Sequence, residues 1–311
     1  MTARAASHVL MIAPVNFRYN AETGETNAFQ APPTPAEEKA VARTAVEQHR
    51  ALRDLLVETG VRVTAVRSLP ETPDASFCNN WFSTHPARQE DAGSGATPAT
   101  VVFYPMLAPS RRIERRADLI ELFRAVYPKI VDLADRETKG EILESTGSLC
   151  LDDNARVAYA ALSPRTSEAL ARQWAQTLGY RLVTFTATDP AGVPYYHTNV
   201  MMFVGHGLAV IALESVENPA ERAELEASLR ASGLTIVPIT RAQVAEFAGN
   251  GLALTNDVGE PLFTMSARAY RAFSSAERAA IERHGRILHT DLSVFEDVGG
   301  GSCRCLLGEL F

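Results

Sequence analysis

One arrangement of apolar and polar positions recurs along the chain: a run with helical periodicity, a turn residue, and a short β-branched run. In the first instance, leucines share one face of a predicted helix over 45–57, and Gly60 separates it from a predicted strand over 61–66. Four further helix–strand pairs are predicted at 118–126 and 130–133, 167–178 and 180–185, 221–231 and 234–239, and 275–283 and 286–289. Such alternation is typical of an α/β protein.

The turn residues of these five units are almost evenly spaced. They lie at Gly60, Tyr127, Gly179, Gly233 and Gly285, so the intervals are 67, 52, 54 and 52 residues. Periods of this size belong to propellers or arrays, and five units predict a closed, radially repeated α/β architecture. A glycine after a helix also suits the left-handed conformation that ends many helices. A doubly wound sheet is the alternative, although no glycine-rich nucleotide-binding motif occurs at a strand-to-helix turn.

Other segments complete the predicted organisation. Further apolar runs predict strands at 9–15, 100–104, 157–161, 200–204, 208–212 and 252–254. The polar stretch 20–34 is predicted to be a loop long enough to act as a lid. The stretch 88–100 has little apolar content and is predicted to be a surface excursion.

Composition excludes several classes of function. The formal net charge of −7 argues against a nucleic-acid partner. No apolar run approaches the roughly 18 residues of a membrane span, and the start of the chain lacks the features of a signal peptide. The four cysteines show neither a disulfide framework nor a zinc spacing. We therefore expect a cytoplasmic protein with reduced thiols and no membrane partner.

The C-terminal stretch 298–307 combines three glycines, two cysteines and an arginine ahead of an apolar run. Glycine lets the backbone turn tightly or approach a ligand closely. A cation beside a cysteine favours the thiolate, which is the nucleophilic form. Cys303 and Cys305 are therefore candidate nucleophiles. The alternative is a glycine turn into a last buried strand, in which the cysteines are small apolar residues.

Candidate partners for a thiol lie earlier in the chain. His197 has Asn199 two residues on, so both side chains share a face of an extended chain, and a thiol nucleophile requires a histidine. Glu144 is either an exposed strand-end acid or the partner that orients a histidine. Asn79 and Asn80 lie among aromatic residues, where buried amides need partners, unless they form an Asx turn. The alternative for His197 is a histidine that is only hydrogen-bonded.

Three arginines are candidate anion-binding groups. Arg111 and Arg112 follow a Pro-Ser pair, and Arg165 follows a Ser-Pro pair. Arginine binds carboxylates bidentately, so each is a candidate clamp for a carboxylate. The alternative for each is an ordinary surface arginine.

Taken together, these residues resemble the guanidino-group-modifying, or pentein, superfamily of arginine deiminases, dimethylarginine dimethylaminohydrolases and amidinotransferases. The chain looks most like the citrulline-utilisation hydrolase branch. The resemblance runs from Ile12-Ala-Pro-Val-Asn-Phe17 to the last residue. It implies one catalytic domain over 1–311, folded as a five-bladed α/β propeller of strand-strand-helix-strand units. That fold agrees with the five units counted along the sequence.

The resemblance also implies roles for individual residues. Cys305, in the Arg-Cys pair after the glycines, matches the nucleophile, and Cys303 is a bystander. His197 matches the general acid/base, and Glu144 the acid that orients it. The implied substrate-binding residues are Asp74 at the α-amine, Asn79, Asn80 and Asn199, and Arg111, Arg112 and Arg165 at the α-carboxylate.

Departures from the family pattern bear on the substrate. Asn80 stands where deiminases have the acid of a Phe-x-x-Asp pattern, and Asn199 where they have His-x-Asp. Glu144-Ser-Thr-Gly147 stands where the family more often reads Glu-x-Gly-Asp. A carboxylate only accepts hydrogen bonds and suits a cationic guanidinium, whereas an asparagine can donate to a carbonyl. The residues therefore favour the ureido group of citrulline, which would give ornithine, CO₂ and ammonia through S-carbamoyl-cysteine.

Several other functions are compatible with the same residues. They are an arginine deiminase or dihydrolase, a dimethylarginine dimethylaminohydrolase-type amidinohydrolase, an amidinotransferase and, from another class, a non-catalytic propeller that binds a partner. The expected partner is a small-molecule amino acid, a homo-oligomer is compatible with the sequence, and no cofactor is expected. The remaining histidines show no ligand spacing, so no metal is expected either.

Overall fold

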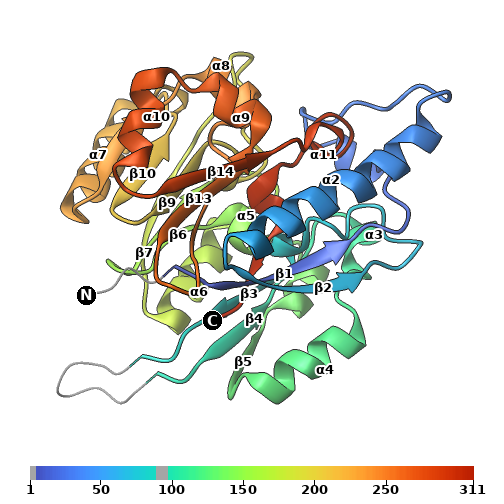
Figure 1. Cartoon of the computed structure of the whole chain (residues 1–311). Coiled ribbons are helices and arrows are strands. Elements are labelled where there is room, and N and C mark those ends of the chain that lie inside the picture. The colour runs from blue at the N-terminus through green and yellow to red at the C-terminus, as the bar shows by residue number, and fades with distance from the viewer. Residues whose placement is uncertain (1–4, 89–96) are drawn as a thin grey trace.

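The strands of the described residues form five three-stranded sheets (Figure 1). The computed structural model describes residues 5–88 and 97–311, so the first four residues and the centre of the predicted excursion lie outside the described part. The sheets are β15 (Gly308–Glu309), β1 (His8–Ala13) and β2 (Arg62–Arg67); β3 (Phe82–His85), β4 (Thr100–Phe103) and β5 (Lys129–Asp132); β6 (Cys150–Asp152), β7 (Val157–Ala161) and β8 (Arg181–Phe185); β9 (Met202–Gly205), β10 (Leu208–Ile211) and β11 (Thr235–Pro238); and β12 (Leu252–Thr255), β13 (Pro261–Ser266) and β14 (Arg286–Thr290). In each sheet the middle strand is antiparallel to the first and parallel to the third.

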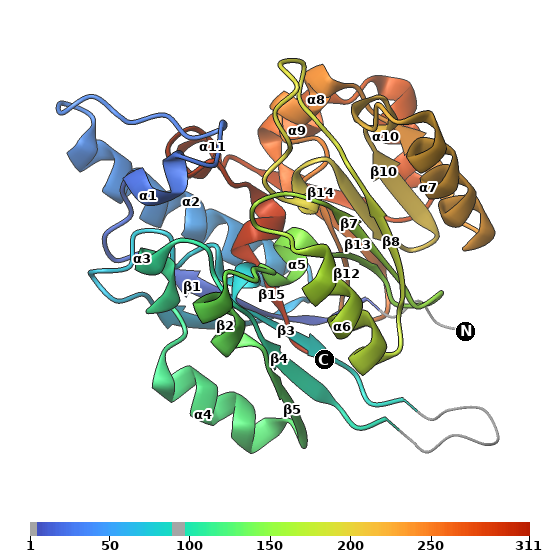
Figure 2. The ribbon, with the colours of Figure 1, turned by 180° about the vertical axis from the view of Figure 1, so that it is seen from behind.

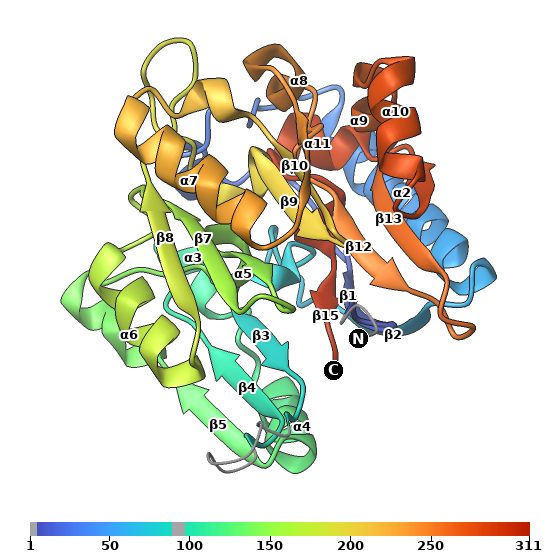
Figure 3. The ribbon, with the colours of Figure 1, turned by 90° about the vertical axis from the view of Figure 1, so that its left-hand side faces the viewer.

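A helix joins the two parallel strands of each sheet, because parallel neighbours need a crossover connection. These helices are α2 (Glu38–Glu58), α4 (Ala117–Val126), α6 (Glu168–Leu178), α7 (Pro219–Ala231) and α10 (Ser275–Glu282). All five coincide with helices predicted from the apolar periodicity, although α2 begins earlier than predicted. Figure 3 shows α4, α6, α7 and α10 on the outside of the ring of sheets. Each helix buries its apolar stripe against a sheet; Trp174 and Leu170 of α6, for example, are fully buried.

The C-terminal strand closes the ring. β15 pairs with β1, with Val9 opposite Glu309 and Leu10 opposite Gly308, so one sheet contains strands from both ends of the chain. The antiparallel edge strands of neighbouring sheets contact one another, as β12 does with β9, β9 with β6 and β15 with β3. The predicted five-bladed α/β propeller is therefore confirmed, and the edge strands surround its axis (Figure 3).

The apolar pattern missed four strands, β3, β6, β13 and β15. β6 and β15 are three and two residues long, which is too short to show alternation. The strand predicted over 200–204 begins at Met202, because η3 (Thr198–Val200) is a one-turn helix. The prediction for Gly285 was also wrong. Gly60, Gly179 and Gly233 have positive φ, but Gly285 does not, and it instead allows close contact with the backbone of Pro261.

A tight turn precedes each edge strand at the axis. These turns are η1 (Cys78–Asn80) before β3, α5 (Ser145–Ser148) before β6, η3 before β9, residues 247–250 before β12, and η5 (Cys303–Leu306) before β15. α5 contacts η1 and η3, and η1 contacts η5. Residues far apart in the sequence therefore meet at one end of the ring.

Shorter helices lie between these elements. They are α1 (Ala21–Gly24), α3 (Pro109–Arg112), α8 (Arg241–Ala245), α9 (Ala267–Ala272) and α11 (Ser293–Gly299). Figure 2 shows α1 beside α11, where the N-terminal loop crosses the ring. Within residues 5–88 and 97–311, none of the helices is both long and apolar enough to cross a membrane.

Candidate active site

Three catalytic candidates meet where the tight turns gather. Cys305 lies on η5, His197 directly precedes η3, and Glu144 directly precedes α5. All three side chains are buried. Cys305 and His197 line a pocket whose free space is about 20 Å³, room for little more than one water molecule. An amino-acid substrate therefore requires the residues that cover this pocket to move.

Glu144 is held as an ionised acceptor for His197. Its Oε2 lies 2.8 Å from His197 Nε2 and 3.5 Å from Arg165 Nη1. Its Oε1 accepts a hydrogen bond of 2.9 Å from the backbone N–H of Leu107. Burial acts to raise the pKa of Glu144, but the charge of Arg165 and the hydrogen bond from His197 outweigh burial and hold the pKa well below its usual range.

The hydrogen bond between Glu144 and His197 determines which nitrogen of the imidazole carries the proton. Because a carboxylate only accepts, Nε2 of His197 carries the proton and Nδ1 is the acceptor of the neutral ring. Burial lowers the pKa of His197 to about 4, against the raising effect of Glu144, so the ring is neutral at pH 7. Gly147 makes room for it, since a Cβ there would lie 2.7 Å from His197 Nδ1 and 2.5 Å from Asn80 Nδ2. Nδ1 is thus available to take a proton.

Arg111 positions Asn80. Its Nε and Nη2 donate to the two carboxylate oxygens of Glu114, each at 2.9 Å, and its Nη1 donates to Asn80 Oδ1 at 2.7 Å. Burial acts to lower the pKa of Arg111, but the attraction of Glu114 outweighs it and raises the pKa. Since a guanidinium only donates, Asn80 must turn its oxygen toward Arg111. The Nδ2 of Asn80 then points elsewhere, and it is buried without a hydrogen-bond partner among the described residues.

Two side-chain amides contact the sulfur of Cys305. The Nδ2 of Asn199 lies 3.6 Å from it, and the Nδ2 of Asn250 lies 3.4 Å from it. Asn250 was not among the residues predicted from the sequence. A positional signal exists, because Asn250 and Asn80 each lie two residues before the edge strand of a sheet. That signal becomes readable only when the strand boundaries are known.

The predicted loop over 20–34 covers the pocket. Asn20 Nδ2 and Thr23 Oγ1 donate to Asp74 Oδ2 at 2.8 and 3.0 Å. Arg165 Nη2 donates to the carbonyl oxygen of Thr23 and to Thr26 Oγ1 at 3.0 and 2.7 Å. Asp74 Oδ1 is buried without a partner in the described part of the chain, and burial raises the pKa of this carboxyl. Asp74 and Arg165, which were predicted to bind the substrate's α-groups, here hold the covering loop.

The glycine-rich stretch is packed against an aromatic ring and the covering loop. A Cβ at Gly299 or Gly301 would lie 2.6 or 2.8 Å from ring atoms of Phe77. Gly300 has a φ of +61°, and its carbonyl oxygen accepts from the Tyr196 hydroxyl and from Asn27 Nδ2. The glycines thus let η5 approach the pocket, as the sequence predicted for a close backbone approach.

Arg112 lies outside the pocket. Its Nε and Nη2 donate to the carbonyl oxygens of Met106 and Leu107 at 3.0 and 3.3 Å, and its side chain is 34% exposed. Consecutive residues of a helix point in different directions, so only one of the two arginines of α3 faces the pocket. That residue is Arg111.

Two other predicted residues contact neighbours outside the substrate pocket. Asn79 Nδ2 donates to Thr146 Oγ1 at 3.3 Å, and Asn79 is not among the residues lining the pocket. The sulfur of Cys303 lies 3.3 Å from Thr264 Oγ1, and burial raises the pKa of this thiol to about 12. Of the two neighbouring thiols, only Cys305 faces the pocket.

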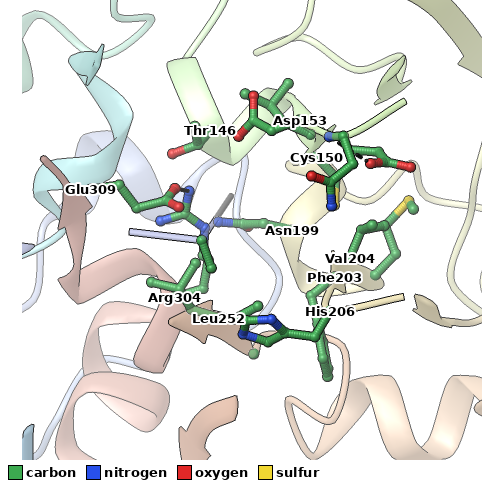
Figure 4. Close-up of a pocket in the computed structure, with 18 of the residues that line it drawn as sticks. Thr146, Cys150, Asp153, Asn199, Phe203, Val204, His206, Leu252, Arg304 and Glu309 are labelled. Atoms are coloured by element: carbon green, nitrogen blue, oxygen red, sulfur yellow. Dashed lines mark hydrogen bonds and ion pairs between the residues drawn. The ribbon is translucent and has the colours of Figure 1, made fainter. Parts of the chain in front are cut away.

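A second cavity lies behind the nucleophile, along the propeller axis. Its free space is about 60 Å³, and its polar lining includes Asn199, Asp153, Arg304 and Glu309 (Figure 4). Arg304 Nη2 donates to Glu309 Oε2 at 2.8 Å. The side chain of Asn199 therefore borders this cavity and also contacts Cys305. Within the described residues, no three His, Cys, Asp or Glu side chains gather closely enough to hold a metal ion.

Comparison with known proteins identifies relatives of this arrangement. The sequence matches the model of the family described as N,N dimethylarginine dimethylhydrolase, eukaryotic, over residues 13–311. A search of curated protein sequences gives no match.

Solved structures share the fold. The arginine dihydrolase ArgZ, from the ornithine-ammonia cycle in cyanobacteria, superposes with a TM-score of 0.73 at 18% identity, covering 97% of this chain and 40% of that one. Its N-terminal domain bound to substrate gives 0.73 at 17% identity, covering 97% of both chains. A dimethylarginine dimethylaminohydrolase adduct with 4-chloro-2-hydroxymethylpyridine gives 0.63 at 18% identity, covering 98% of this chain and 100% of that one. The chain thus spans about 40% of the full-length arginine dihydrolase.

Proposed function

The chain belongs to the eukaryotic N,N-dimethylarginine dimethylhydrolase family, whose members are hydrolases acting on guanidino groups of amino acids, and we propose that this member instead hydrolyses the related ureido group of citrulline. The products are ornithine, CO₂ and ammonia. Cys305 is the nucleophile, His197 the acid/base, and Glu144 the residue that orients His197. The choice of citrulline rests on the hydrogen-bonding groups and the charges of the pocket.

The observation that carries the proposal is the orientation of Asn80. Arg111 occupies its oxygen at 2.7 Å, so the group left for a ligand is the Nδ2 donor, which is buried and unpaired within the described residues. A guanidinium consists of donors and would meet another donor there. A ureido group has a carbonyl oxygen that accepts such a hydrogen bond, and satisfying a buried donor is favourable.

The charges around the pocket support the same substrate. The carboxylate of Glu114 pairs with Arg111, and that of Glu144 lies 3.5 Å from Arg165. Neither glutamate lines the pocket, whereas Asp74 does, and Asp74 contacts the covering loop, where it suits the α-ammonium group. A cationic guanidinium beside Asn80 would therefore be desolvated without a dedicated counter-charge, which costs several kcal/mol, on the order of the penalty for an unpaired buried ion. A neutral ureido group avoids this cost.

The reaction follows from these positions. His197 Nδ1 takes the thiol proton of Cys305, and the sulfur attacks the ureido carbon, forming a C–S bond while the carbonyl oxygen gains negative charge. Asn80 Nδ2 donates to that oxygen. The C–N bond to the ornithine side chain breaks as His197 returns the proton to the leaving amine. One water, deprotonated by His197, then cleaves the S-carbamoyl group, and the resulting carbamic acid decomposes to CO₂ and ammonia.

Arginine dihydrolase activity is the second candidate, and the structural similarity to ArgZ favours it. Two successive hydrolyses of arginine pass through citrulline, so the proposed reaction is the second half of that process. The two proposals differ in whether the pocket also accepts the cationic guanidinium.

The test is to incubate the purified protein separately with citrulline, arginine and N,N-dimethylarginine and to quantify ornithine, citrulline, dimethylamine and ammonia. We expect ornithine from citrulline, little turnover of the two cations, and no turnover by Cys305→Ser. Ornithine from both arginine and citrulline would establish the dihydrolase instead. Dimethylamine release would establish the reaction for which the family is described, and any of these activities surviving in Cys305→Ser would exclude Cys305 as the nucleophile.

A further inference from the structure

Asn250 is a buried residue of the turn that precedes β12, and its side-chain amide is fully engaged. Its Oδ1 accepts from the backbone N–H of Arg304 at 3.0 Å. Its Nδ2 donates to the carbonyl oxygen of Asn199 at 2.8 Å and lies 3.4 Å from the sulfur of Cys305. Because an oxygen must face the N–H of Arg304, the orientation of the amide is determined. The sulfur of Cys305 therefore has the Nδ2 donor as its nearer contact, and the Oδ1 of the same amide lies farther away, at 3.8 Å.

A second amide approaches the same sulfur from the neighbouring blade. Asn199 Nδ2 lies 3.6 Å from Cys305, within the range of an N–H···S hydrogen bond. The backbone carbonyl of Asn199 is itself held by Asn250, so the two asparagines form one connected unit. The thiol can place its proton on Asn250 Oδ1 at 3.8 Å, whereas a thiolate only accepts and uses both donors at 3.4 and 3.6 Å. Because the two donor contacts are shorter than the acceptor contact, the pair of amides favours the anion.

From this geometry we propose that Asn250 is a catalytic residue of this site, which acts with Asn199 as a two-amide cradle for the thiolate of Cys305. The inference deepens the proposed function, since it concerns activation of the same nucleophile. Asn250 stabilises the thiolate that forms when His197 takes the proton of Cys305, and Asn199 supplies the second donor. In this arrangement Asn80 remains the donor for the substrate oxygen, whereas Asn199 and Asn250 donate to the sulfur of Cys305.

Other charged and titratable groups also surround the sulfur, and each contributes to its pH dependence. They are His197 and Tyr196 ahead of η3, Asp74 ahead of η1, Arg111 on α3, Arg165 ahead of α6, and Cys303 and Arg304 on η5 itself. None of them is altered by a substitution at Asn250. A comparison of variants therefore isolates the amide from this background.

The experiment measures alkylation of Cys305 by iodoacetamide as a function of pH, with the modified peptide quantified by mass spectrometry. The other three cysteines are buried and burial raises each of their pKa values to about 12, so Cys305 reacts selectively. In Asn250→Asp, the oxygen facing Arg304 is kept, the donors are lost and a negative charge is added beside the sulfur. We expect the pH of half-maximal alkylation to rise by about one unit or more, because the lost hydrogen bonds and the added charge both disfavour the thiolate. Asn250→Ser removes the amide without adding a charge, so a shift in the same direction in this variant measures the loss of the amide itself.

Thr264→Val is the matched control, because it removes the hydroxyl beside the neighbouring sulfur of Cys303 and leaves Cys305 untouched. Its alkylation profile should equal that of the wild type. A folded Asn250→Asp or Asn250→Ser protein with an unshifted profile would overturn the inference. Alkylation needs no substrate, so its outcome is independent of whether citrulline is turned over.

A measurement that needs no change at Asn250 covers the case in which both variants fail to fold. In protein labelled with ¹⁵N-asparagine, two side-chain NH₂ groups should titrate together with Cys305, and both responses should disappear in Cys305→Ala. Asparagine amides that do not respond to ionisation of Cys305 would overturn the proposal.

Discussion

Arg111 shows how a buried cation determines the hydrogen-bonding sense of its neighbour. An asparagine in isolation offers either a donor or an acceptor to a ligand. Beside Arg111 only the donor is offered, because the guanidinium donates to the oxygen of Asn80 and the amide nitrogen is left to face a ligand. An aspartate at this position would keep the contact with Arg111 and present a second oxygen to the pocket. One atom therefore separates a pocket suited to a carbonyl from one suited to a guanidinium.

This argument predicts the effect of Asn80→Asp. We expect kcat for citrulline to fall by about 10²–10³-fold, the usual effect of removing one donor to a developing oxyanion. Arginine should bind more tightly to the variant than to the wild type, which isothermal titration calorimetry with Cys305→Ser in the background can measure. Asn218→Asp is the control, because it adds the same charge at the exposed N-cap of α7. Equal citrulline kinetics in Asn80→Asp and the wild type would contradict the role of Asn80.

The tight turns before the edge strands are the elements that build the site. Asn80 and Asn250 lie two residues before a strand begins, and Asn199 and Cys305 lie three residues before one, so the repeat of the fold gathers these side chains at the axis. Only part of this was predictable from the sequence. Helical periodicity over 8 to 21 residues located the outer helices, whereas edge strands such as β6 and β15, with three and two residues, carry too few positions to show a period. The strand after Asn250 was predicted at 252–254, but β3 was not, so the position that Asn250 shares with Asn80 could not be recognised.

At the scale of elements, the resemblance to a family distinguished residues that their spacing in the sequence could not. Cys303 and Cys305 are two residues apart and would share a face of an extended chain, so spacing does not separate them and only the family motif did. The structure shows why spacing is uninformative there: residues 303–306 form a one-turn helix, so the two sulfurs diverge toward Thr264 and Asn250. Likewise, the adjacency of Arg111 and Arg112 in the sequence did not reveal that α3 turns one of them away from the pocket.

Gly147 provides a test of the turn that supports His197. A methyl group there would collide with both the imidazole and Asn80, so Gly147→Ala should displace His197 and lower kcat for the proposed reaction by at least about tenfold. Gly140→Ala is the contrasting variant, because Gly140 has open space around it but a φ of +71°. It should cost about 1 kcal/mol of unfolding free energy without changing kcat. Measuring kcat and the unfolding free energy for both variants distinguishes the effect of a steric clash from the effect of backbone strain. A normal kcat in Gly147→Ala would show that His197 tolerates displacement.

At the scale of the whole molecule, closure of the ring buries histidines that belong to different blades. Burial lowers the pKa of His49, His85 and His197 from 6.5 to about 4, 3 and 4 respectively. These rings are neutral in the folded protein near neutral pH, whereas the unfolded chain binds protons as pH falls below about 6.5. The folded state therefore loses stability on acidification through these groups, beginning near pH 6.5 and continuing to about pH 4.

The sign and the size of this effect can be tested on His49, which lies on α2 away from the pocket. Between about pH 6.5 and 4, one such histidine adds a slope approaching 1.4 kcal/mol per pH unit to the unfolding free energy, with stability rising as pH rises. Urea unfolding of His49→Leu should show a slope lower by about that amount, and a curve parallel to the wild type above pH 7. If the two slopes agree across the acidic range, the histidine is protonated equally in both states and its burial does not couple folding to pH. A reduced slope together with unchanged activity at pH 7 would show that this buried histidine makes folding sensitive to acid, whereas His197 also serves the chemistry.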